Sequence, residues 1–151
     1  MTVVALQPQT DARTRVLHLL PDLQVGGGQT VVLNQLLATD RERFDVRVAA
    51  LDARGPMGAD LEAASGTAIL DLGLHRPADG PGALARLVKH LRQQGVDLLH
   101  VHSDRDRKVG QAAALAAGVP VVGHLHAEWV HLGPMPSRRS SALNRLRSKV
   151  F

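Results

Sequence analysis

A buried strand that leads through three glycines into a helix is the feature that most constrains the fold of this chain. The segment from residue 15 to residue 37 reads RVLHLLPDLQVGGGQTVVLNQLL. Its first part has the continuous apolar run that is typical of a parallel strand covered on both faces. Gly26, Gly27 and Gly28 then allow backbone geometries that other residues adopt only at a cost, and they leave N–H groups uncovered. A helical apolar pattern follows at once. Because the N–H groups and the dipole of a helix N-terminus attract anions, we expect a phosphorylated ligand near this turn.

Strand-like and helix-like segments alternate along the rest of the chain. Strands are expected at residues 15–20, 46–51, 68–73, 97–102 and 120–125. The helices between them are expected at 28–39, 57–65, 81–94 and 105–117. This alternation is typical of an α/β fold with a doubly wound parallel sheet, a Rossmann-like architecture. Right-handed crossovers then predict the strand order 3-2-1-4-5.

The composition fits one globular domain and argues against several other classes of protein. The chain has 151 residues, of which 44% are apolar, which is enough for one sizeable core. It contains no cysteine, so neither a disulfide framework nor a thiolate metal site is expected. No segment approaches the length of a membrane span. The net charge is +4, but no aromatic residues are interleaved with the basic ones, so we predict no nucleic-acid binding.

The two ends of the chain are predicted to differ from the domain between them, which we place at residues 15–136. Residues 1–14 lack the pattern of a signal peptide and are expected to form a disordered leader. Residues 137–151 predict the start of a basic amphipathic helix, which suits a solvated face and also suits contact with an anionic lipid surface. Because the apolar side of that helix has no obvious partner, we expect the chain to be a truncated piece of a larger architecture.

Polar residues follow three of the strands that the predicted order makes neighbours. In an open parallel sheet, ligands bind beyond the carboxyl ends of the strands, where the strand order reverses. The glycine turn follows the first strand, His102 and Asp104 follow the fourth, and His126 follows the fifth. The sequence therefore predicts that these residues line one crevice.

The chain resembles the N-terminal domain of GT-B glycosyltransferases of the subfamily 4-like group, which are retaining enzymes that use nucleotide sugars. The resemblance rests on LLPDLQVGGGQTVVLN and on VDLLHVHSDRDRKVGQAAALAAGVPVVGHLHAEW, and it covers nearly the whole chain. The family usually has two glycines followed by Ala-Glu in the first motif. Here Gly28 and Gln29 stand in place of that Ala-Glu pair.

The resemblance implies a set of roles for these residues. Gly27 and Gly28 would lie against the donor diphosphate, and His126 would be the catalytic residue beside the transferred sugar and the acceptor. Gly26, His102 and Asp104 are predicted to bind substrate from their place at the ends of the strands.

The resemblance also implies the partners and the location of the protein. No cofactor is expected beyond the nucleotide sugar, which acts as co-substrate, and the acceptor is expected to be a sugar, a lipid or a small molecule. A C-terminal donor-binding domain is missing from the chain, which alone is expected to be inactive. The expected location is cytoplasmic, and the basic cluster allows peripheral contact with the inner membrane face.

Two alternatives to a glycosyltransferase stay open at this point. Gly26 and Gly28, with Asp52 near the end of the second strand, imitate the fingerprint of a nicotinamide dinucleotide site. Val31 stands where that fingerprint needs a small residue, and PDLQV separates the strand from the glycines. The second alternative is a non-catalytic binding module on the same fold, because fold alone does not decide function.

Paired histidines raise the question of a metal site. His100 and His102, like His124 and His126, are two residues apart and would lie on one face of a strand. No third ligand is evident in the sequence, so no metal site is predicted. His100 is interpreted as a structural residue, and His18 as a structural or a surface-exposed one.

Overall fold

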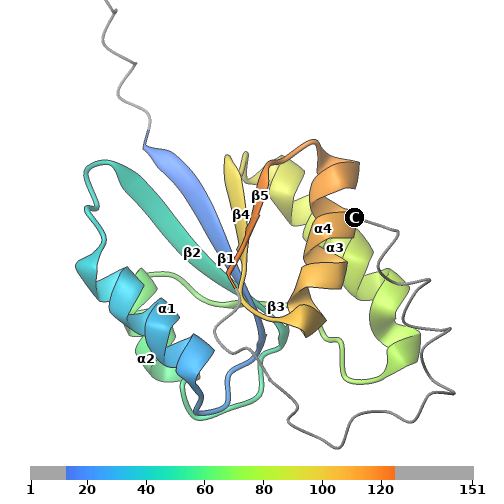
Figure 1. The fold of residues 1–151 in the computed structure, drawn as a ribbon, viewed down its shortest axis with the longest axis horizontal. Coiled ribbons are helices and arrows are strands. Elements are labelled where there is room, and N and C mark those ends of the chain that lie inside the picture. The colour runs from blue at the N-terminus through green and yellow to red at the C-terminus, as the bar shows by residue number, and fades with distance from the viewer. Residues whose placement is uncertain (1–12, 125–151) are drawn as a thin grey trace, which may run out of the picture.

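The computed structural model describes residues 13–124, which form a parallel sheet with helices on both faces (Figure 1). The strands are β1 (Thr14–Asp22), β2 (Phe44–Asp52), β3 (Leu70–Asp71), β4 (Leu98–Val101) and β5 (Val121–Gly123). The helices are α1 (Gly27–Ala38), α2 (Gly58–Ser65), α3 (Gly80–Gln93) and α4 (Asp104–Ala117), with a short 3-10 helix η1 (Pro77–Asp79).

The sheet has the order β3-β2-β1-β4-β5, and every neighbouring pair is parallel. The predicted strand order and the predicted α/β class are therefore confirmed. β1 is the central strand, and its residue His18 lies level with Val48 on β2 and with His100 on β4. This register places the first and fourth strands side by side, as the crevice prediction requires.

Two apolar clusters attach the helices to the two faces of the sheet. Leu17 and Leu19 of β1 pack in the cluster that α3 and α4 cover, whereas Leu20 packs in the cluster that α1 and α2 cover. Figure 1 shows these two helix pairs on opposite sides of the strands. Because successive strand residues point to opposite faces, His18 shares the α1 and α2 side of the sheet.

The predicted strand 68–73 is wrong in length, since β3 contains only residues 70 and 71. β3 is an edge strand and pairs with β2 alone. The Asp71 carboxylate accepts a hydrogen bond from the Gly73 N–H at 2.8 Å, and Gly73 has a φ of +64°. The chain therefore turns out of the strand at this point. The other elements begin and end within three residues of their predicted bounds.

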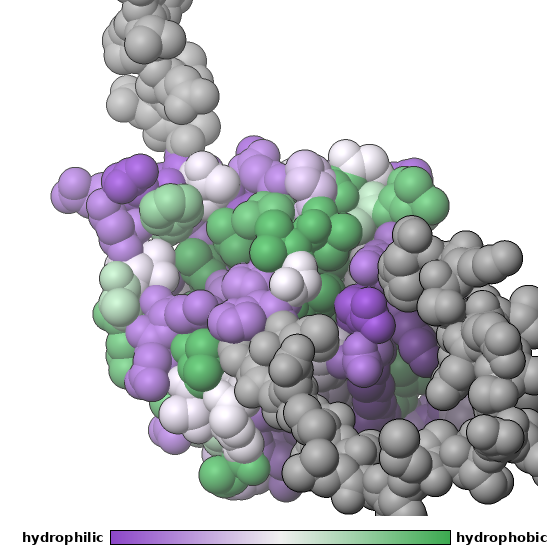
Figure 2. All heavy atoms as spheres, viewed as in Figure 1, coloured by the Kyte–Doolittle hydropathy of each residue, from purple (hydrophilic) through white to green (hydrophobic). Residues whose placement is uncertain are grey.

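The other edge of the sheet is formed by the short strand β5, whose Val122 is 48% exposed. The space-filling view shows hydrophobic residues gathered over the strands between the two helix pairs, next to hydrophilic ones (Figure 2). Among residues 13–124, no helix is long and apolar enough to cross a bilayer. Three predictions lie outside the described residues: the leader up to residue 12, the basic helix at 137–151, and His126. Of the predicted leader only residues 13 and 14 are described, and β1 already begins at Thr14.

Candidate functional site

The glycine turn forms the N-terminus of α1, beyond the carboxyl end of β1. Gly26 is the N-cap with φ −165° and ψ 166°, which is extended backbone, and the helix begins at Gly27. None of the three glycines has a positive φ, so the turn does not use the backbone geometries that only glycine adopts easily. A Cβ added at Gly27 would meet no heavy atom within 4 Å. A Cβ added at Gly26 would lie 2.7 Å from Gln29 Oε1, so the open space beside the N–H groups of this helix N-terminus is at Gly27.

Gln29 fixes the turn to the end of β1. Its side chain is buried, and its Nε2 donates to the Asp22 carbonyl oxygen at 3.2 Å and to the Asp22 Oδ1 at 3.0 Å. A glutamate at this position would bring two carboxylates together and could donate no such bonds. The amide at residue 29 thus suits the aspartate at residue 22, and the departure from the family's usual glutamate has a local structural reason.

His102 follows β4 at the same edge of the sheet and is held by a buried carboxylate. Its backbone N–H donates to Asp106 Oδ2 at 3.0 Å, and Asp106 Oδ1 accepts from the Ser103 N–H at 2.7 Å. Burial raises the pKa of Asp106, whose side chain is completely enclosed. Asp106 is therefore a positioning residue for His102. The sequence analysis missed it, although the Ser-x-x-Asp spacing of a helix cap was available as a signal.

Asp104 lies in the first turn of α4, where a negative charge complements the helix dipole. Its exposed carboxylate pairs with Arg107 one turn further along at 2.8 Å. The structure thus places Asp104 at the predicted edge. The predicted role of Asp104 in substrate binding stays a prediction.

Asp52, the acid of the dinucleotide alternative, is engaged by two neighbours at the end of β2. Its carboxylate forms an ion pair with Arg54 and lies 3.4 Å from His75 Nδ1. The Arg54 guanidinium, as hydrogen-bond donor, holds the pKa of Asp52 well below its usual range. A ribose hydroxyl would have to compete with these partners for the carboxylate. The arrangement fits a structural acid better than a nucleotide ligand.

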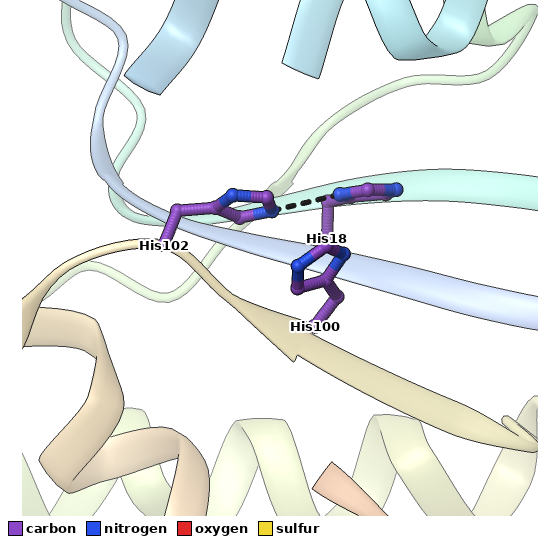
Figure 3. Close-up of side chains that lie close together, drawn as sticks. All are labelled: His18, His100 and His102. Carbon is purple, nitrogen blue, oxygen red and sulfur yellow. Dashed lines mark hydrogen bonds between the residues drawn. The ribbon is translucent and has the colours of Figure 1, made fainter. Parts of the chain in front are cut away.

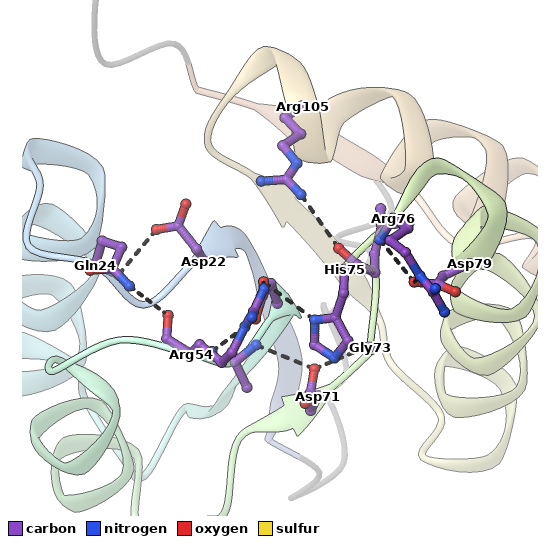
Figure 4. Close-up of polar contacts among 12 residues, drawn as sticks. Asp22, Gln24, Arg54, Asp71, Gly73, His75, Arg76, Asp79 and Arg105 are labelled. Carbon is purple, nitrogen blue, oxygen red and sulfur yellow. Dashed lines mark hydrogen bonds and ion pairs between the residues drawn. The ribbon is translucent and has the colours of Figure 1, made fainter.

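The same contacts belong to a set of bonds that joins the loops at the carboxyl edge (Figure 4). Gln24 Nε2 donates to the Arg54 carbonyl oxygen at 3.1 Å, which links the loop after β1 to the loop after β2. Asp71 Oδ1 accepts from the Ala53 N–H at 3.3 Å, which links β3 to that second loop. The edge where ligands bind in such folds is therefore tied together from three strands.

Three histidines gather on one face of the sheet, and the sequence analysis did not foresee this group. His18 of β1 lies level with His100 of β4, and His102 lies two residues further on the same side. His18 Nδ1 and His102 Nε2 are 2.8 Å apart and share a hydrogen bond (Figure 3). Burial, together with the nearby His100, lowers the pKa of His18 to about 3. Of the two interpretations of His18, surface exposure is wrong, because the side chain is buried in this group.

The lowered pKa of His18 makes stability depend on pH. The unfolded chain takes up a proton near the ordinary value of 6.5, whereas the folded chain resists protonation down to about 3. Stability is therefore full above pH 6.5 and falls as the pH is lowered through this window. Between pH 7 and pH 5 the loss from this one group should be about 2 kcal/mol. Urea unfolding at pH 7, 6 and 5 in the presence of a chelator measures it. H18N should lack this part of the pH dependence, and equal slopes for the two proteins would contradict the assignment.

A surface groove lies on the outer side of α3, away from the predicted site residues. Its volume is about 660 Å³, and it is lined by residues of that helix from Pro81 to Gln93. Neither the glycine turn nor His102 contributes to it. The groove therefore takes no part in the site at the carboxyl edge.

The parallel sheet, its strand order and the bare helix N-terminus at its carboxyl edge define a Rossmann-like α/β protein. The model of Glycosyltransferase Family 4 matches residues 25–151, which is most of the chain. The chain belongs to this family, and the membership supports a function of the glycosyltransferase type.

Two solved structures are similar to this chain. UDP-GlcNAc 2-epimerase from Neisseria meningitidis, solved bound to UDP-GlcNAc, is similar over 88% of this chain and 38% of its own, with 20% identity and a TM-score of 0.50. The chain thus spans well under half the length of that GT-B-like enzyme. The C-terminal domain of a hydrogenase from Pyrococcus furiosus is similar over 74% of this chain and 91% of its own, with 17% identity and a TM-score of 0.49. Among curated protein sequences, none matches significantly.

Proposed function

We propose that the chain is the acceptor-side half of a retaining GT-B glycosyltransferase. The enzyme would move a sugar from a nucleoside diphosphate donor to an acceptor hydroxyl, with retention at the anomeric carbon. The observation that carries the proposal is the bare N-terminus of α1 at the carboxyl edge of a family 4 domain. A second, donor-binding domain would complete the crevice.

The glycine turn would act on the leaving group. As the bond between the sugar and the diphosphate breaks, negative charge grows on the phosphate oxygens. The N–H groups of Gly27 and Gly28 and the dipole of α1 would stabilise that charge. Because these donors carry out the electrostatic work, the proposal requires no metal and no cofactor for the transfer itself.

His102 and His126 would face the sugar and the acceptor. Asp106 holds the backbone of His102, and the hydrogen bond with His18 Nδ1 would fix the orientation of its imidazole. His126 remains the proposed catalytic residue on the resemblance of the strand-five motif to the family. The acceptor would be a sugar, a lipid or a small molecule, and peripheral contact with a membrane would suit a lipid acceptor.

An activity assay tests this proposal. The chain is incubated with UDP-, GDP- and ADP-sugars, alone and together with a donor-binding domain encoded beside it, and release of the nucleoside diphosphate is measured. We expect turnover only when both halves are present. Full turnover by the chain alone would overturn the division of labour that we propose.

Calorimetry separates this function from the dinucleotide alternative. NADH and a nucleoside diphosphate are titrated into the chain and into the D52N variant. We expect no tight binding of NADH to either protein, because Arg54 and His75 already engage Asp52. Tight NADH binding that is lost in D52N would instead establish a nicotinamide site.

A further inference from the structure

We propose that His18, His100 and His102 form a binding site for one Zn²⁺ ion on the sheet face that α1 and α2 share. This site shares His102 with the proposed sugar-binding residues, but the proposed sugar transfer does not require the ion. One ligating nitrogen from each ring lies within 4.8 Å of the other two. No other group of three such ligands within this distance occurs among residues 13–124.

The backbone brings these three side chains together without any special loop. β1 and β4 are adjacent and parallel, and the register sets His18 level with His100. The spacing of two residues keeps His102 on the same face. The ring centroids of His100 and His102 are 4.2 Å apart, and that of His18 is 4.9 Å from His100 and 5.0 Å from His102 (Figure 3).

The donor set and the spacing suit a zinc-class ion. Three imidazoles with one open position are an established tetrahedral zinc set, with Zn–N distances of about 2.0–2.1 Å and nitrogens about 3.3 Å apart. The bonded nitrogens of His18 and His102 are 2.8 Å apart, so they need to separate by a fraction of an ångström. The ligating nitrogens lie within 4.8 Å of one another, so the His100 nitrogen has to move closer by up to about 1.5 Å. The proton in the hydrogen bond between His18 and His102 moves to the other nitrogen of the same ring. The imidazoles then stay neutral, and each presents a lone pair to the ion.

The surroundings of the cluster favour a soft or borderline cation over a hard one. His18 and His102 are buried, and burial keeps His18 in the neutral form that binds metals. The Asp106 carboxylate accepts a hydrogen bond from the backbone N–H of His102 and so helps to position this ligand. Residues next to metal ligands commonly have such a role. All three ligands are nitrogens, whereas Mg²⁺ and Ca²⁺ prefer oxygen. We therefore expect selection for Zn²⁺ or Co²⁺ against Mg²⁺.

Metal titration of the tag-free chain tests the proposal. After dialysis against a chelator, Zn²⁺ and Mg²⁺ are titrated by calorimetry at pH 7.5, and Co²⁺ is followed by its visible absorption. We expect one Zn²⁺ per chain, a four-coordinate Co²⁺ spectrum and no response to Mg²⁺. H100Q should weaken Zn²⁺ binding at least about 100-fold. H90Q, which changes a histidine of α3 on the other side of the sheet, should bind as the original chain does.

Two results would overturn the proposal. One is a Kd for Zn²⁺ above about 100 μM in the unmodified chain. This measurement does not depend on the folding of any variant. The other is unchanged Zn²⁺ binding in both H18N and H100Q, which would place the ion elsewhere. If H100Q fails to fold, the first result and H18N still decide.

Discussion

Replacing Gly55 by alanine should cost the folded chain about 3–5 kcal/mol of its free energy of unfolding. Gly55 has a φ of +153°, a conformation that residues with a side chain rarely adopt. A Cβ at this position would lie 2.1 Å from the Leu23 carbonyl carbon and 2.5 Å from the Gln24 nitrogen. These are backbone atoms that cannot rotate away, so the loop after β2 would have to separate from the loop after β1.

The separation would also break backbone hydrogen bonds between these loops. Met57 N–H donates to the Leu23 carbonyl oxygen at 3.1 Å, and Leu23 N–H donates to the Arg54 carbonyl oxygen at 3.4 Å. Urea unfolding or the Tm measures the loss. G66A is the matched control, because Gly66 has a φ of +73° but nothing within 4 Å of an added Cβ. It should lose only about 1–2 kcal/mol, the cost of the backbone conformation alone. A G55A variant as stable as G66A would contradict this account.

The strands and helices were predictable because they follow from local patterns that the packed structure preserves. On α3, Leu87 and Leu91 are buried in the core, and Leu84 and Val88 pack against it. The strand order followed from the alternation and from right-handed crossovers. Those parts of the fold depend on which residues are apolar and how they are spaced, and a single sequence contains that information.

The site was predictable only in its placement at one edge of the sheet. His18 and His102 are 84 residues apart, and their contact depends on the register of β1 against β4. The bond from Gln29 to Asp22 and the close approach of Gly55 to Leu23 likewise depend on how two loops meet in space. The sequence also could not show whether the glycine turn uses the backbone geometries that glycine allows. At this turn glycine leaves space because it has no side chain, and it does not adopt a positive φ. Composition alone does not separate these two uses of glycine.

Replacing Gly27 by aspartate should reduce kcat/KM for sugar transfer at least about 100-fold, which corresponds to about 2.7 kcal/mol of transition-state stabilisation. The expectation rests on the proposed role of the turn in holding the leaving diphosphate. A carboxylate at Gly27 would occupy the helix N-terminus and repel the growing charge on the phosphate oxygens. The assay uses the chain together with its donor-binding domain.

Stability should move in the opposite direction from activity in this variant, and this contrast makes the experiment decisive. A Cβ at Gly27 meets no heavy atom within 4 Å, and an acid in the first turn of α1 interacts favourably with the helix dipole. Unfolding free energy should therefore stay the same or rise by up to about 1 kcal/mol. G27A adds the same Cβ without the charge and should keep activity within a few-fold of the original. If G27D also keeps its activity, the phosphate groups do not lie at this helix, and the glycine turn has no electrostatic role in the reaction. If G27A loses as much activity as G27D, the added Cβ and not the charge causes the loss. Glycine at this position would then be needed because the ligand approaches the backbone closely.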